Sequence, residues 1–130
     1  MATKVFIDSR YLDRGKAFVS ISPSLGRLVI YKEAYTILKD NYGQDIDFVQ
    51  ILTDDERKEI FWVKPCTEEA PGSRKWDSTS TNTRAMSIRA LIKVFKLEDA
   101  ETIKIPLEWD DEEMAGRIDL SKKISRKSKG

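Results

Sequence analysis

An internal duplication constrains the fold of this chain more than any other feature of its sequence. Gly26-Arg27-Leu28-Val29-Ile30 precedes a segment with helical spacing, and two apolar stretches joined by Asp54-Asp55-Glu56 follow it. The same order of features returns after Thr83. Arg84 lies 57 places after Arg27, and Asp110 lies 56 places after Asp54, so the two copies keep their register to within one residue. We therefore predict two strand–helix–hairpin units within one domain.

The first copy begins with two short strands. Ala17–Ser22 alternates along its length, and Leu28–Ile30 is rich in β-branched residues, which favours extended structure. Tyr31–Leu38 then takes helical spacing, and Gly43 is the residue expected to end this helix in the left-handed conformation. A hairpin is predicted from residue 47 to residue 64.

The second copy shows the same pattern more clearly. Its helix follows the i, i+3, i+4, i+7 template, and the positions that match are Ile88, Leu91, Ile92 and Phe95. Ser87 is placed to cap that helix. Residues 103–109 and 114–120 alternate as a hairpin with one buried face. Pro106 lacks a backbone N–H, so we expect it at a sheet edge or a bulge.

Length and composition indicate one soluble domain. A chain of 130 residues with 40% hydrophobic and 35% charged residues is typical of a single globular core. Neither a membrane-spanning apolar run nor the apolar core of a signal peptide is present in the sequence, which favours a cytoplasmic protein. The predicted organisation is an extension at 1–16, a barrel domain at 17–120 made of repeats 17–65 and 81–120 with a linker at 66–80, and a disordered basic tail at 121–130.

The nearly neutral net charge of +1 conceals a segregation along the chain. Residues 121–130 hold five basic residues and no acidic one, which leaves 18 basic and 22 acidic residues in the rest of the chain. A body with a net charge of −4 thus carries a tail with a charge of +5. Such a tail favours contact with an anionic partner, although lysine-rich ends also serve solubility.

The sequence from Gly26-Arg27 through the predicted helix to Asp54-Asp55-Glu56 resembles the swapped-hairpin barrels of the AbrB, SpoVT and MraZ transcription regulators. The resemblance covers about residues 20–64 and, more loosely, 83–120, like the tandem arrangement of MraZ. It implies a mainly β fold with two short helices, built as a pseudo-twofold swapped-hairpin-like β-barrel. It also implies contact with DNA through the arginine after the glycine, here Arg27, with Arg84 as its counterpart. Tyr31 replaces the proline that usually starts the family helix.

Basic and aromatic side chains form the candidate nucleic-acid site. Arg27 pairs with Arg84 and Lys32 with Arg89 at the same spacing of 57 places, so a pseudo-twofold barrel would present them as a symmetric set suited to duplex DNA. The alternative is that these side chains are solvated and have no binding role. Trp76, in a polar segment, is expected to be exposed and able to stack on single-stranded bases, although duplex DNA is favoured. The tail adds Lys122, Lys123, Arg126 and Lys127.

Catalysis and metal binding find little support. The chain contains no histidine, and its single cysteine, Cys66, has only Lys64 nearby to lower its pKa, so we expect a structural cysteine. The two acidic clusters lie where hairpin turns favour aspartate, and we expect turn chemistry there rather than a metal site. The predicted function is non-enzymatic nucleic-acid binding and transcription regulation without a cofactor, by a monomer or a homodimer. The alternative is a protein–protein interaction module of the phage-type or accessory class.

Overall fold

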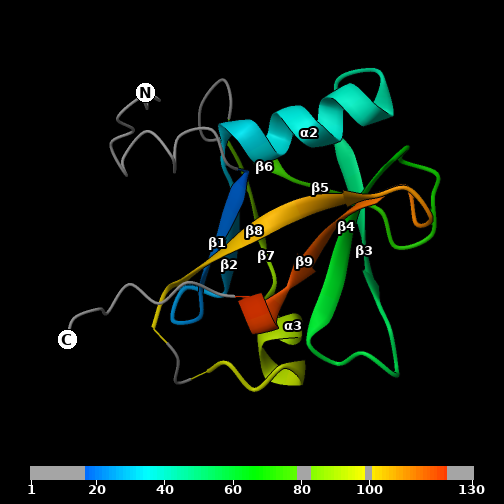
Figure 1. The fold of residues 1–130 in the computed structure, drawn as a ribbon. Coiled ribbons are helices and arrows are strands. Elements are labelled where there is room, and N and C mark those ends of the chain that lie inside the picture. Colours follow the sequence, from blue (N-terminus) through cyan, green and yellow to red (C-terminus); the bar gives the residue numbers. More distant parts are fainter. Residues whose placement is uncertain (1–16, 79–82, 99–100, 123–130) are drawn as a thin grey trace, which may run out of the picture.

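The protein folds into a mainly β structure that is described for residues 17–78, 83–98 and 101–122 in a computed structural model (Figure 1). The predicted extension at 1–16 and the residues of the tail after 122 lie outside these ranges. Within them, nine strands form one antiparallel, nearly closed, barrel-like sheet in the order β5-β3-β4-β9-β8-β1-β2-β7-β6. None of the helices in these ranges is both long and apolar enough to cross a membrane.

The two predicted units are present in the order of elements. The first contains β1 (Phe18–Ser22), β2 (Arg27–Ile30), α2 (Lys32–Tyr42), β3 (Phe48–Thr53) and β4 (Ile60–Cys66). The second contains β7 (Arg84–Ser87), α3 (Arg89–Val94), β8 (Ile103–Asp110), β9 (Ala115–Asp119) and a 3-10 turn (Leu120–Lys122). Between them lie two very short strands, β5 (Arg74–Lys75) and β6 (Asp77–Ser78). The prediction of two strand–helix–hairpin repeats is therefore confirmed.

The two units interleave rather than stand side by side. The hairpin β8–β9 of the second unit inserts between β4 and β1 of the first. Strand β2 pairs with its counterpart β7, and β4 pairs with its counterpart β9. Because every one of these contacts joins the two halves, neither half can bury its apolar face without the other.

One continuous core fills the space that the sheet encloses. Side chains from both units contribute to it, and the most deeply buried of the large ones are Phe61, Ile21, Leu28, Ile30, Leu38, Ile46, Ile105 and Ile118. Helix α2 contacts β1, β4, β8 and β9 through a face that includes Ala34, Tyr35 and Leu38. It lies across the top of the view in Figure 1, with α3 at the bottom. As predicted, Gly43 ends α2 with a φ of 88°.

Two details of the second unit differ from the prediction. Ser87 is the last residue of β7, and Ile88 occupies the N-cap position without a side-chain cap bond, so Ser87 does not cap α3. Pro106 lies in a central strand, because β8 has β1 on one side and β9 on the other. The Leu107 N–H donates to the carbonyl oxygen of Ala17, the residue before β1, so the ring nitrogen of Pro106 faces β9, whose pairing with β8 begins only at Leu107. No ladder bond is lost there.

Candidate binding surfaces

Arg27 and Arg84 lie on opposite faces of the sheet. Arg27 stands opposite Ser87 in the ladder, and Arg84 stands opposite Ile30. Opposed residues share a face and successive residues alternate, so Arg84 points to the same side as the fully buried Ile30 while Arg27 points outward. The predicted symmetric set is therefore wrong.

A slip of one residue explains the error. The sequence repeat sets Arg84 57 places after Arg27, which is an odd number. Residues of β2 and β7 that share a face, such as Val29 and Ala85, are separated by an even number of places. A shift of a single residue along a strand turns its side chain to the other face. The repeat therefore predicted an arginine at the correct strand position but on the wrong face of the sheet, because Arg84 lies on the face of Ile30.

Arg84 has an internal, structural environment. Its guanidinium carbon lies 4.3 Å from the centre of the Tyr35 ring, and its Nη1 donates to the carbonyl oxygen of Thr83. A cation over an aromatic face is attracted by the negative face of the ring. Tyr35 itself is buried on α2, so this arginine stabilises the contact between that helix and β7.

Trp76 is buried, with 5% of its surface exposed, and the expectation of an exposed stacking residue is wrong. Its indole Nε1–H donates to the carbonyl oxygen of Ile46 at 3.0 Å, and its ring meets Tyr35 edge-on with centroids 5.9 Å apart. Trp76 is also the one residue between β5 and β6, which are the two edge strands of the sheet. The side chain therefore anchors the segment that joins the two ends of the barrel.

Three other arginines converge on Ser87. Arg27 is its ladder partner, Arg74 donates through Nη2 to its carbonyl oxygen, and Arg89 follows two residues later. Gly26, with a φ of 63°, makes room for Arg89, because a Cβ at Gly26 would lie 2.4 Å from the Arg89 Cγ. None of the three forms an ion pair with a residue that the structure describes. We call Arg27, Arg74 and Arg89 the arginine cluster; sequence analysis identified two of its members and missed Arg74.

A cleft of about 420 Å³ adjoins this cluster. It opens where the barrel is incompletely closed, because β3 pairs with β5 only at Phe48 and Val49. Beyond those residues, β3 has β4 on one side and no described strand on the other. We call this cleft the seam groove; its lining residues are Ile51, Thr53, Arg74, Ser87, Ile88, Arg89, Ala90 and Leu91.

The remaining predicted basic residues lie elsewhere. Lys32 is exposed at the first residue of α2. It lies two residues after Ile30, whereas Arg27 is at the other end of β2. Lys122 belongs to the 3-10 turn and lies 3.8 Å from a carboxylate oxygen of Glu108, so the predicted disorder of the tail does not include it. Lys123, Arg126 and Lys127 lie outside the described residues.

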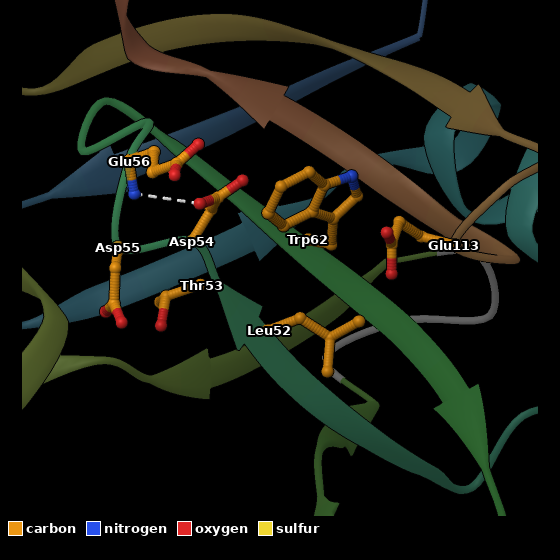
Figure 2. A pocket seen from close by; sticks show the side chains of 7 residues that line it. All are labelled: Leu52, Thr53, Asp54, Asp55, Glu56, Trp62 and Glu113. Atoms are coloured by element: carbon orange, nitrogen blue, oxygen red, sulfur yellow. Dashed lines mark hydrogen bonds between the residues drawn. The ribbon is translucent and has the colours of Figure 1, made fainter.

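Residues of both acidic hairpin turns border a second hollow, of about 380 Å³, around Trp62 (Figure 2). A side-chain oxygen of Asp54 accepts the backbone N–H of Glu56 at 2.8 Å, and Asp110 accepts that of Glu112 at 3.0 Å. These matching bonds are those of Asx turns. They confirm the predicted turn role of the two clusters. The other oxygen of Asp110 accepts the Trp62 indole N–H at 3.0 Å.

Hydrogen bonding and charge also lower the pKa of two carboxyl groups of β8. The Trp62 N–H holds the pKa of Asp110 below its ordinary value, and the Arg117 guanidinium does the same for the pKa of Glu108. A lowered pKa in the folded state stabilises the fold above the ordinary pKa, and that contribution is lost as the pH falls through the lowered value.

Acid should therefore weaken the fold partly through Asp110. We expect the urea midpoint to fall between about pH 6 and about pH 3, a range that spans the ordinary aspartate pKa. It should fall less in Asp110→Asn, because that variant has no carboxyl group to protonate at this position. Glu112→Gln removes one charge from the same turn and serves as the matched control. Equal acid sensitivity in the two variants would contradict the role of the Trp62 bond.

Cys66 shows no sign of activation as a nucleophile. It is partly buried at the end of β4, and burial raises the pKa of its thiol more than the nearby Lys64 lowers it. A raised pKa leaves less thiolate at neutral pH, and the thiolate is the reactive form. The structural interpretation of this residue accords with its environment.

Comparison with known protein families, with curated proteins and with solved structures finds no match to this chain.

Proposed function

We propose that this chain is a non-enzymatic nucleic-acid-binding protein that contacts duplex DNA through the arginine cluster. The observation that carries the proposal is the convergence of Arg27, Arg74 and Arg89 around Ser87 without an ion-pair partner among the described residues. A guanidinium group suits phosphate because its planar fork donates two parallel hydrogen bonds. The resemblance of Gly26-Arg27 to the DNA-contacting segment of the AbrB, SpoVT and MraZ regulators supports a role in transcription regulation within the cytoplasm.

Charge distribution sets the expected character of this binding. The body of the chain carries a net charge of −4, and Asp54-Asp55-Glu56 follows directly after Thr53 of the seam groove. Acidic groups near the contact oppose phosphate, so we propose that the basic residues of 121–130 add to the attraction. Binding that rests on phosphate contacts releases counterions and weakens steeply with salt.

Fluorescence anisotropy with random-sequence duplex DNA at two salt concentrations tests the proposal. The double variant Arg27→Ala, Arg89→Ala should bind roughly tenfold or more weakly at low salt, and each lost phosphate contact should reduce the salt slope by about one. Arg57→Ala, Lys58→Ala removes the same charge from the β3–β4 turn and serves as the control. Equal losses of DNA affinity in both double variants would mean that only net charge matters. Absence of DNA binding by the parent protein at low salt would exclude the proposal.

A protein-interaction module is the second candidate function. The seam groove favours it, because apolar side chains and a strand edge line that cleft beside two arginines.

A further inference from the structure

We propose that the seam groove binds an extended, acidic peptide segment of a partner protein as an added strand along β3. The inference develops the second candidate function, the protein-interaction module, and concerns the groove rather than the outward face of Arg27. It shares Arg74 and Arg89 with the proposed DNA contact, so the two ligands would compete for these side chains. The partner is defined by three features of the groove: a strand edge, an apolar lining and a local positive charge.

The strand edge comes from the incomplete closure of the barrel. β4 pairs with β3 along its whole length, from Phe48 to Thr53, whereas β5 pairs only with Phe48 and Val49. The backbone of residues 50–53 therefore borders the groove without a described strand on that side. Such an edge is a template on which another chain can add its own backbone hydrogen bonds.

The lining of the groove suits side chains of alternating character. Ile51, Ile88 and Leu91 supply apolar surface, and the volume of about 420 Å³ falls within the roughly 300–1,000 Å³ of ordinary binding clefts. In an added strand, successive side chains point to opposite faces, so alternate residues can meet this apolar surface. A phosphate backbone has no apolar groups to place there, which favours a peptide over a nucleic acid in the groove.

The charged residues in and beside the groove determine which charge the partner carries and in which direction it lies along the groove. Arg74 and Arg89 line the groove together, and the lining contains no acidic residue. Beyond Thr53, the acidic turn that starts at Asp54 repels negative charge at that end. The acidic residues of the partner therefore lie toward Arg74 and Arg89, and the part near Thr53 is uncharged or basic.

Ala90 offers a mild way to test the charge of the groove. It lines the groove, lies on α3 and is exposed, so a longer side chain there does not disturb the core. Ala90→Glu places a negative charge in the groove, and Ala90→Lys places a positive one at the same point. Circular dichroism of both variants shows whether the fold is unchanged.

The probes are short labelled peptides with valine in one half and glutamate in the other, the same peptide with lysine in place of glutamate as a control, and a valine–glutamate peptide interrupted by proline. We expect the full-length protein to bind the glutamate peptide at least tenfold more tightly than the lysine peptide or the proline-interrupted one. Ala90→Glu should weaken this binding at least tenfold, and Ala90→Lys should not weaken it. Amide chemical shifts should change mainly at residues 50–53 and 87–91.

Three results would overturn the inference. Equal affinity for the glutamate and lysine peptides would remove the charge argument, and equal affinity for the interrupted peptide would remove strand addition. Shift changes in these residues on adding duplex DNA, without any on adding the glutamate peptide, would assign the groove to nucleic acid. A parent protein that binds duplex DNA but not the glutamate peptide would refute the inference and leave the proposed function standing, because the arginines can contact phosphate without an added strand in the groove.

Discussion

Trp76→Ala should lower the free energy of unfolding by about 3–5 kcal/mol, the range for truncating a large buried aromatic side chain. The indole fills the core beside Tyr35, and its N–H satisfies the Ile46 carbonyl. Alanine would leave a cavity and an unpaired buried carbonyl oxygen, and each is costly. The effect should be large because the side chain holds the segment between β5 and β6, where the two ends of the barrel meet.

Urea unfolding followed by circular dichroism measures this loss. Val94→Ala is the control, because Val94 is 68% exposed and its truncation should change stability by no more than about 0.5 kcal/mol. A Trp76→Ala protein as stable as the control would mean that the indole is a surface group, as its polar surroundings in the sequence suggest. Near-parental stability would thus contradict the anchoring role.

Phe61→Ala should have a comparable effect, about 3–5 kcal/mol, and it should act on the whole molecule. Phe61 is fully buried on β4, stands opposite Ile118 of β9, and contacts the Phe95 ring with centroids 5.8 Å apart. Both of these neighbours belong to the second unit. The cavity therefore weakens the junction of the two interleaved units rather than one unit alone.

The number of unfolding transitions tests this interleaving. Backbone circular dichroism and tryptophan fluorescence should report one shared transition in both the parent and Phe61→Ala, because each hairpin depends on strands of the other unit. A variant in which one half unfolds at a lower urea concentration than the other would show that the units fold separately. Val94→Ala again provides the reference, as a substitution at the last residue of α3 that removes no buried group.

Local patterns gave the elements of the fold because each depends on neighbouring residues. Alternation identified β1 and the second hairpin, apolar stretches around an acidic turn identified the first, and the glycine at position 43 marked the end of α2. The matched aspartates of the two turns were also predictable, since an Asx turn needs only a side chain and a backbone N–H two residues away. These interactions are short in sequence, so composition and spacing specify them.

The candidate sites were less predictable because they depend on strand pairing. Nothing local distinguishes Arg27, which points outward, from Arg84, which lies over Tyr35. Arg74 gave no signal, because its contact with Ser87 arises only when the two ends of the sheet approach each other. Trp76 lies among polar residues in the sequence, yet the closure of the barrel buries it.

The sequence by itself determined that this chain contains two strand–helix–hairpin units with equivalent acidic turns. Periodicity and turn chemistry act over a few residues, and both are visible without coordinates. Only the tertiary structure decided which faces the arginines occupy and where the barrel stays open. In a sheet, a displacement of one residue reverses every side chain, and the pairing that sets this displacement is made between residues far apart in the chain.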